Sequence, residues 1–498
     1  MQESELKVEA APKTRLHARF DYKWIVLSVT TIGALMAAID GTIVILGLPD
    51  MMEKLHADMI EMVWVIMGYI LVSTVFLLTF GRVADMLGRV RMYNLGFVVF
   101  TIGSALCGFS TTATALILFR LIQGSGAAMM VVNSVALITE VFPPDQRGQA
   151  LGINGITFAA GGVIGPVLGG LILSAANWRW IFFINVPVGI FGAIWGYVAL
   201  KEQGTRKGGE RFDPIGAVSF SLGLLALLGA LTGGISLGFT STPILSLFGL
   251  FLIALAVFIG WEQRASNPVL DFSLFRSRVY TFSVLAVMMQ SLALFAVNFL
   301  ITFYLQGVRG FDPLRAALML IPLPVMTSIV APLSGRLADR VGARLPATLG
   351  LAIQVVALFW LMTQLTATSS YGVLVVGLGL LGLGGGMFFS PNTSAAMNAA
   401  PPNRLGIASA ALATLRQVGM VTSFALALAV AASSLPQDVM MKLFVGTDVQ
   451  LGSQLMQQFV VGMHSAFLLS TVLCVAAAGL SLVRGKEDRR ALAQAVRP

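Results

Sequence analysis

Two charged residues stand inside long apolar runs of the sequence, where a charge needs a partner or a function. Asp40 lies in the run 24–46 and Arg120 lies in the run 114–139. A charge at the centre of a bilayer costs at least about 2.5–3.5 kcal/mol, so such residues mark interaction sites or functional sites. A carboxyl group in this setting suits proton uptake and release, because burial raises a carboxyl pKa and a neighbouring arginine lowers it. Two interpretations stay open: a proton-coupling pair, or a static ion pair that only fixes helix packing.

The positions of these two charges predict that they meet. Asp40 lies about two-thirds of the way out along its run, and Arg120 lies about a third of the way in from the outer end of its own. Antiparallel helices place both residues at similar depth. We therefore predict a direct or water-bridged contact, in which Arg120 tunes the proton affinity of Asp40.

A third intramembrane charge, Arg416, lies near the middle of the run 406–432, with no obvious acidic partner in its half of the sequence. It could meet an anionic substrate group or hold water in a cavity. It could equally bond backbone carbonyls at a helix break, which is the interpretation that the sequence slightly favours. The run 315–336 contains no acid, so nothing here favours doubly charged cationic substrates.

The elements that must position these residues are membrane-spanning helices, each needing about 20 mostly apolar residues. We expect fourteen spans: 24–46, 60–81, 92–110, 114–139, 149–174, 181–200, 214–234, 244–262, 280–305, 315–336, 345–365, 372–396, 406–432 and 459–483. With the N-terminus in the cytoplasm, the cytoplasmic segments hold 25 of the 32 Lys and Arg residues. This positive-inside bias supports an even number of spans with both termini cytoplasmic.

Composition excludes most other classes of protein. Apolar residues make up 57% and charged residues 11%, against about 25% charged in soluble domains. The net charge of +9 is explained by the loops, so we expect no nucleic-acid partner. The three histidines form no metal or catalytic cluster, and Gly384-Gly385-Gly386 is followed by no Lys-Ser/Thr, so we expect no enzyme, no metal and no ATP site. Any energy that the protein uses must therefore come from an ion gradient or from a partner. We expect no cofactor other than the gradient.

An internal repeat divides the chain. The segment from Gly81 to Gly88 recurs from Gly335 to Gly342 at an offset of 254, and Pro143-Pro144-Asp145-Gln146-Arg147 recurs as Pro401-Pro402-Asn403-Arg404. The offset leaves room for eight spans, so we expect two six-span halves with two spans inserted between them. The predicted divisions are a cytoplasmic tail 1–23, a six-helix bundle 24–200, a linker with two helices 201–279, a six-helix bundle 280–483 and a cytoplasmic tail 484–498.

The repeated turn carries a candidate cytoplasmic gate. Asp85 lies near the expected start of the third span, where a helix N-terminus favours a negative charge. Glu140 ends the fourth span on the same side and could pair with Arg89. The predicted gate comprises Gly81, Asp85, Gly88, Arg89, Glu140 and Asp339. The alternative is that these residues provide only turn chemistry and topogenic charge.

Several motifs together resemble the major facilitator superfamily, and within it the fourteen-span drug:proton antiporters of the EmrB/QacA type. The segment Gly81–Arg91 resembles the superfamily's signature loop between spans two and three. The segments that resemble the antiporter branch are Asp40–Pro49, Arg120–Gly126, Gly161–Gly170, Trp178–Pro187 and Tyr304–Gln306. The resemblance runs from about residue 24 to 483, and it departs from the family at Ile45, where Asn is common.

The resemblance implies an all-α major facilitator fold and proton-coupled export by alternating access. It identifies Gly161, Gly165, Pro166, Gly169 and Gly170 as an antiporter motif. Because the first, second and fourth of these recur every four residues, they lie on one helix face and allow close backbone approach. The functional interpretation is a hinge or seal between the halves; the alternative is ordinary helix packing.

The leading hypothesis is a multidrug exporter of hydrophobic or amphipathic small molecules in the cell membrane. A lipid or lipid-linked exporter of the same fold is the alternative, and a non-transporting receptor or scaffold is a third. The expected partners are the substrate, protons and lipid, with an outer adaptor protein left open and a monomer expected. The candidate cavity residues are Tyr69, Asn133, Asn154, Asn298, Tyr304, Met387 and Arg416, although each is more commonly a packing residue.

Overall fold

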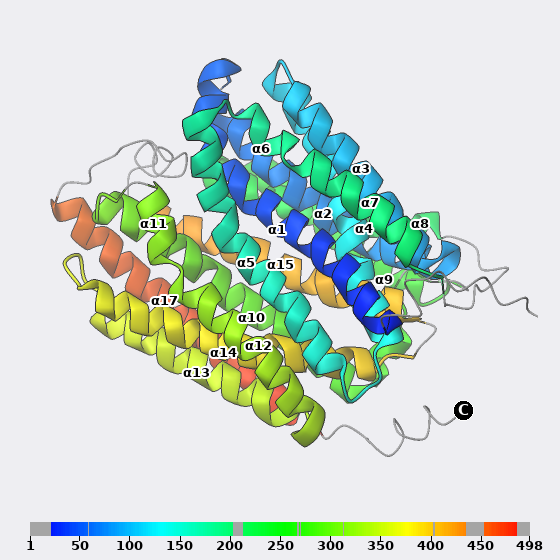
Figure 1. Ribbon diagram of the computed structural model, residues 1–498. Helices are drawn as coiled ribbons and strands as arrows, with labels where there is room; N and C mark the ends of the chain where they lie inside the picture. The colour runs from blue at the N-terminus through cyan, green and yellow to red at the C-terminus, as the bar shows by residue number, and fades with distance from the viewer. Residues whose placement is uncertain are drawn as a thin grey trace, which may run out of the picture.

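The computed structural model describes residues 21–57, 59–202, 213–265, 268, 270–311, 313–401, 404–434 and 453–485. Within these ranges the regular structure is helical, as expected for an all-α membrane protein (Figure 1). The predicted tails 1–23 and 484–498 lie almost entirely outside the described residues.

The helices fall into three groups along the chain. The N-terminal half contains α1 (Tyr22–Lys54), α2 (Met59–Leu87), α3 (Arg89–Phe109), α4 (Ala113–Val141), α5 (Arg147–Ala175), α6 (Arg179–Phe183) and α7 (Asn185–Ala199). The inserted pair is α8 (Pro214–Leu237) and α9 (Thr242–Glu262). The C-terminal half contains η2 (Phe272–Arg276), α10 (Arg278–Phe303), η3 (Tyr304–Val308), α11 (Pro313–Met319), α12 (Pro322–Val341), α13 (Arg344–Gln364), α14 (Tyr371–Asn398), α15 (Leu405–Ser434) and α17 (Ser453–Val483).

Thirteen helical segments among the described residues are long and apolar enough to cross a membrane. The remaining predicted span, 315–336, is not one continuous helix. Its chain forms the short α11, which ends at Met319, and then α12, which begins at Pro322. Prolines 322 and 324 explain this break, since proline has no N–H to donate and is tolerated only in the first turn of a helix. With α11 and α12 taken as one crossing, the arrangement agrees with fourteen spans.

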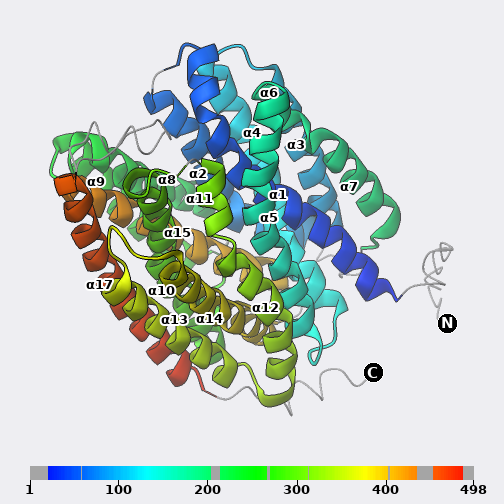
Figure 2. The same cartoon turned by 60° about the vertical axis from the view of Figure 1, so that its left-hand side comes forward.

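The two halves pack side by side, and the figures show α1–α7 on one side and α10–α17 on the other (Figures 1 and 2). Within the N-terminal half, α4 packs on α2 and α3, and α1 packs on α5. Between the halves, α5 packs on α12 and α2 packs on α15. Each contact joins a helix that carries the repeated Gly-x-x-x-Asp segment to the helix that follows the repeated Pro-Pro segment of the other half. The inserted helices α8 and α9 pack mainly on each other, and α8 also contacts α2 and α15.

The outward faces of several helices expose large apolar side chains, as a surface in contact with lipid should. In α9, Leu252 and Ile253 are 61% and 65% exposed, and Phe191 of α7 is 58% exposed. A soluble protein rarely exposes apolar patches of this extent. The structure therefore supports a multi-pass membrane protein, with the polar side chains concentrated inside the bundle.

Candidate functional site

The structure brings Asp40 and Arg120 into direct contact, as the sequence predicts. Asp40 lies on α1 and is fully buried, and Arg120 lies on α4 and is 1% exposed. The Nη1 atom of Arg120 donates to Oδ2 of Asp40 at 2.6 Å. The pair therefore lies inside the N-terminal half, where removal of either charge would leave the other buried without its partner.

Three neutral polar residues that the sequence analysis did not single out complete this cluster. The side-chain amides of Gln123 and Asn185 donate to Oδ1 of Asp40 at 2.8 and 3.0 Å, and both also donate to the hydroxyl of Ser104. Gln123 and Asn185 lie within the segments that resemble the antiporter branch, so the motif residues offered a signal for them. Ser104 of α3 carried no such signal.

Donors surround the Asp40 carboxylate on both oxygens. These donors come from α4 and α7, so the Asp40 carboxylate links α1 to both of these helices.

Tyr69, which the sequence suggests as a cavity residue, lies in this cluster and is not among the residues that line the cavity described below. Its ring lies under the guanidinium of Arg120, with the Cζ atom 4.1 Å from the ring centroid. Arg120 also donates through Nε to the carbonyl of Val65 at 3.2 Å. A cation over an aromatic face is stabilised by the ring quadrupole, and this interaction strengthens when water is excluded.

A second polar site joins the halves at the end predicted to be cytoplasmic. Asp85, in the last turn of α2, accepts hydrogen bonds from the backbone N–H groups of Gly406 and Ile407 at 3.1 and 3.0 Å. These N–H groups belong to the first turn of α15, which has no internal acceptors for them. Asp85 lies four residues before the start of α3, as expected, but the backbone N–H groups that it binds belong to α15. The carboxylate points across to α15 because α2 packs against that helix.

Asp339 makes the equivalent contact in the opposite direction. Its carboxylate accepts from the backbone N–H groups of Gly148 and Gln149 at 3.1 and 3.2 Å, at the start of α5. The repeats therefore pair crosswise between the halves. The Asp of the Gly-x-x-x-Asp segment in each half caps the helix that follows the Pro-Pro segment of the other half. We call the Asp85–α15 and Asp339–α5 contacts the two latches.

Glycine permits the close approach at each latch. A Cβ atom on Gly81 would press against Ala410 and the Gly406 carbonyl, and one on Gly335 would overlap the Gly148 carbonyl. The turns that follow use Gly88 and Gly342, whose φ angles are 112° and 96°, a region that side-chain-bearing residues rarely adopt. The predicted Gly81 and Gly88 therefore have specific geometric roles at this end.

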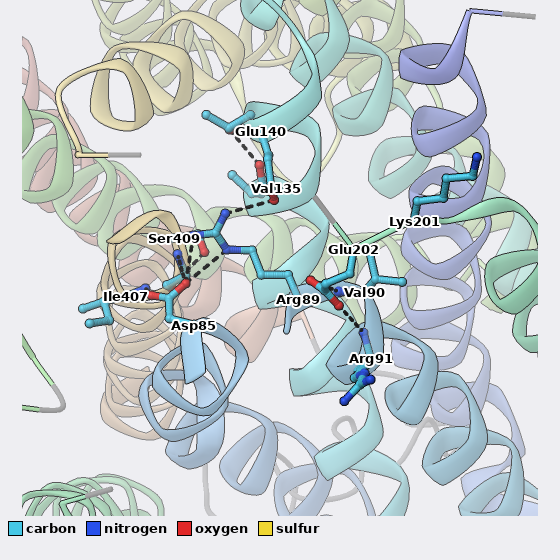
Figure 3. A network of polar contacts seen from close by, with 12 residues as sticks. Asp85, Arg89, Val90, Arg91, Val135, Glu140, Lys201, Glu202, Ile407 and Ser409 are labelled. Atoms are coloured by element: carbon cyan, nitrogen blue, oxygen red, sulfur yellow. Dashed lines mark hydrogen bonds and ion pairs between the residues drawn. The ribbon is translucent and has the colours of Figure 1, made fainter. Parts of the chain in front are cut away.

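Arg89 and Glu140 reinforce the first latch, as predicted (Figure 3). Arg89 donates to Asp85 through Nη2 at 2.9 Å and to Glu140 through Nη1 at 3.0 Å. A third carboxylate, Glu202, accepts from the N–H groups of Val90 and Arg91 at 3.3 Å each and so caps α3 within its own half. At the second latch, the repeat places Ala343 where the first has Arg89, so the two latches are not chemically equal.

The glycines of the predicted antiporter motif face α1. A Cβ atom on Gly161 would lie too close to Ala38, and one on Gly165 would overlap the hydroxyl of Thr42. The Thr42 hydroxyl also donates to the Gly161 carbonyl at 3.2 Å. Because α1 and α5 belong to the same half, these contacts favour ordinary helix packing over a seal between the halves, the two interpretations that the sequence leaves open. The contacts are those of close helix packing within the N-terminal half.

The remaining motif residues fit the same description. Gly169 faces Ile43 and Leu46 of α1, and Gly170 is partly buried on the same helix. The helix α5 runs from Arg147 to Ala175 through Pro166 without interruption.

Substitution of Gly165 is expected to destabilise this packing. A valine at this position would force Thr42 away, and overpacking of this kind typically costs about 1–3 kcal/mol. We expect Gly165→Val to lower the thermal unfolding temperature of the purified protein. Gly162, one turn away and open on its outer face, is the matched control, since a Cβ there meets no atom within 4 Å. Equal effects of Gly162→Val and Gly165→Val would contradict the packing role.

A central cavity of about 30 Å³ lies between the halves and contains two of the predicted cavity residues. Asn154 of α5 and Arg416 of α15 line it, together with Ser134, Phe389, Thr393 and Ser409. Phe389 and Thr393 escaped prediction, although their spacing of four residues places them on one face of α14. The Cζ atom of Arg416 lies 5.5 Å from the centroid of the Phe389 ring.

The other predicted cavity residues lie elsewhere. Asn133 is one position from the lining residue Ser134, and its amide donates to the Met129 carbonyl of its own helix. Tyr304 donates to the Thr366 carbonyl at 2.7 Å, away from the cavity. Met387 faces Gly350 of α13, and Asn298 is exposed on α10 outside the cavity lining. Adjacent positions of a helix point in different directions, and the packing of each helix decides which of them face the cavity.

Comparison with known proteins agrees with this architecture. The family model described as Major Facilitator Superfamily matches residues 30–424. The chain belongs to the major facilitator superfamily. Over 400 residues it is 34% identical to the multidrug resistance protein Stp of Mycobacterium tuberculosis (strain CDC 1551 / Oshkosh), covering 80% of this chain and 74% of that protein. Over 421 residues it is 33% identical to the riboflavin transporter RibZ of Clostridioides difficile (strain 630), covering 84% and 89%.

A solved structure confirms the fold. The human organic anion transporter MFSD10 aligns with a TM-score of 0.62 at 15% sequence identity, covering 91% of this chain and 99% of that chain. At this level of identity the likeness concerns the fold alone. The family and its transporter members establish that this major facilitator protein is a membrane transporter of small molecules and not an enzyme.

Proposed function

We propose that this chain is a proton-coupled exporter of hydrophobic or amphipathic small molecules in the cell membrane, of the fourteen-span drug:proton antiporter type. The observation that carries the proposal is the buried Asp40 carboxylate, which Arg120 pairs and Gln123 and Asn185 hydrogen-bond inside the N-terminal half. A buried ionisable group of this kind in a membrane transporter is characteristic of a proton pathway. The similarity to the multidrug resistance protein Stp supports the class of substrate.

The two latches supply the second part of the proposed mechanism. They hold α2 against α15 and α12 against α5 at the end predicted to be cytoplasmic, so this side is closed in the structure. Opening the central cavity to the cytoplasm requires both carboxylates to leave their helix N-termini. Proton binding at Asp40 would shift α1, and α1 transmits this shift through its glycine contacts to α5, which carries one latch partner.

The orientation in the membrane is inferred from the charge distribution, and a monomer is proposed with it. Both termini lie in the cytoplasm because the Lys and Arg residues concentrate on that side. The protein works as a monomer with its pathway between its own two halves, and the bilayer, protons and the substrate are its partners. We propose no cofactor other than the proton gradient.

Transport by the purified protein in liposomes tests the proposal. Because export exchanges substrate for protons, an acidic vesicle interior should drive dye accumulation by molecules whose cytoplasmic side faces outward. We expect an amphipathic dye to accumulate under an inside-acid gradient and to leave when a proton ionophore collapses the gradient. Dye movement that is the same with and without the gradient would contradict proton coupling. Movement of labelled lipid without dye transport would instead support the lipid-exporter hypothesis.

A further inference from the structure

Exposed arginines gather at one end of the C-terminal half, where α12 ends and where α10 and α13 begin. Val279, in the first turn of α10, packs against Ala338 in the last turn of α12 and Ala343 just before α13. This packing brings the start of α10 to the turn between α12 and α13. The exposed arginines on these elements and on η2, which precedes α10, are Arg276, Arg278, Arg336, Arg340 and Arg344.

The acidic residues on the same elements do not balance this positive charge. Within η2, α10, α12 and α13, Asp339 is the only acidic residue, and its carboxylate caps the start of α5. Asp271, just before η2, forms an ion pair with Arg404. The five exposed arginines therefore form a surface of net positive charge at the end predicted to be cytoplasmic.

Exposed apolar side chains continue from these arginines toward the middle of the membrane. On α12, Leu333 and Leu337 share an exposed face with Arg336, because residues three and four apart are neighbours on a helix. On α13, Leu345 and Leu349 are exposed in the turns that follow its first residue. A molecule with an anionic head and apolar chains fits this order of cations and apolar side chains.

The equivalent turn of the N-terminal half lacks such a surface. The repeat places Met86 and Val90 where the C-terminal half has Arg340 and Arg344. In addition, the carboxylate of Glu202 accepts from the backbone N–H groups at the start of α3, so an acidic group covers this turn (Figure 3). An anionic molecule therefore meets a carboxylate at the first turn and an excess of arginine at the second.

We propose that the arginines around the α12–α13 turn bind the phosphate headgroup of an anionic phospholipid, whose acyl chains lie along α12 and α13. A guanidinium binds phosphate oxygens through two parallel hydrogen bonds, and clustered arginines beside a membrane helix attract anionic lipids. Because Asp339 lies between Arg336 and Arg340 in the sequence, the bound lipid contacts the helix that carries the second latch. Binding at this surface does not depend on which molecule the protein transports, so it stands apart from the proposed function.

Native mass spectrometry of the full-length protein, purified in detergent, measures the binding of single lipid molecules. The probes are phosphatidylglycerol, which is anionic, and phosphatidylcholine with the same acyl chains, which has no net charge. We expect the unmodified protein to bind phosphatidylglycerol more tightly. The double variant Arg336→Gln with Arg344→Gln should weaken phosphatidylglycerol binding by about 10–30-fold, as expected for two arginines at an anionic headgroup, and should leave phosphatidylcholine binding unchanged.

Two matched variants separate this site from net charge and from structural damage. Arg91→Gln with Arg264→Gln removes the same charge from exposed positions at the same predicted side, and it should keep the binding of phosphatidylglycerol. Arg336→Lys with Arg344→Lys keeps the charge and should bind phosphatidylglycerol more tightly than the glutamine variant does. Equal binding of the two lipids by the unmodified protein would overturn the inference. So would an equal loss in the Arg91 and Arg264 variant or in the lysine variant.

A soluble headgroup analogue distinguishes a lipid site from a site for a free anion. Glycerol 3-phosphate carries the phosphate without acyl chains, so it makes no contact with the apolar side chains of α12 and α13. Added in excess over the lipid, it should leave phosphatidylglycerol bound to the unmodified protein. Displacement of phosphatidylglycerol by glycerol 3-phosphate would assign the arginines to a soluble phosphate and overturn the lipid inference.

Discussion

Asp40→Asn is expected to abolish transport driven by a pH gradient. The substitution keeps the size of the side chain but removes its titratable group, so proton flow can no longer be exchanged for substrate. It also leaves the charge of Arg120 buried without its carboxylate, which typically costs about 3–5 kcal/mol of stability. The measurements are gradient-driven dye accumulation in liposomes and the thermal unfolding temperature of the same preparation. We expect accumulation at the level of empty liposomes and a lower unfolding temperature.

Two variants keep this prediction interpretable. The double variant Asp40→Asn with Arg120→Gln removes both charges, so it should recover much of the lost stability without recovering transport. Asp50→Asn is the matched control, because Asp50 lies on the same helix and accepts a hydrogen bond from the Trp178 backbone N–H at 3.2 Å. Asp50→Asn should transport normally. Normal gradient-driven export by Asp40→Asn would eliminate Asp40 as the coupling residue.

The second large effect is expected from the combined variant Asp85→Asn and Asp339→Asn. Each change removes a charged acceptor from the N-terminus of a helix in the other half, where hydrogen bonds to a charged group are worth about 1.5–3 kcal/mol. Loss of both latches should favour opening of the cytoplasmic side by roughly 100-fold or more. A thiol introduced by Thr393→Cys in the central cavity reports this opening through its labelling rate in inside-out vesicles.

Both native cysteines, Cys107 and Cys474, are buried, so the same variants without the Thr393→Cys change provide the labelling background. Glu202→Gln is the control, because Glu202 also caps a helix N-terminus but within its own half. It should leave the labelling rate unchanged. Labelling that is equally slow in the Asp85 and Asp339 variant would show that the latches do not hold this side closed.

Local patterns were sufficient for the architecture. Runs of apolar residues, the distribution of Lys and Arg and the repeated Gly-x-x-x-Asp segment all depend on properties that each stretch of sequence carries by itself. A span must satisfy its backbone hydrogen bonds internally and present apolar side chains to lipid, whatever its neighbours are. The same reasoning made Asp40 and Arg120 informative, because a charge in a bilayer must find a partner at its own depth.

The broken tenth span shows where such reasoning stops. Its residues are apolar enough to suggest one helix, but prolines 322 and 324 end α11 and start α12. Because each proline lacks an N–H donor, the apolar run forms two helices instead of one. Together, α11 and α12 take the place of one predicted span. Only a helix boundary therefore differs from the prediction, and the topology is unchanged.

What the sequence by itself determined was the class of molecule, its repeated halves and the charged residues that need partners. Only the tertiary structure decided which partners they have. Asp85 serves α15 instead of α3, the glycine face of α5 meets α1 instead of the other half, and Gln123, Asn185 and Ser104 converge on Asp40. The physical reason is that hydrophobicity and charge act on each helix separately, whereas rotation and pairing are set by contacts between helices far apart in the chain.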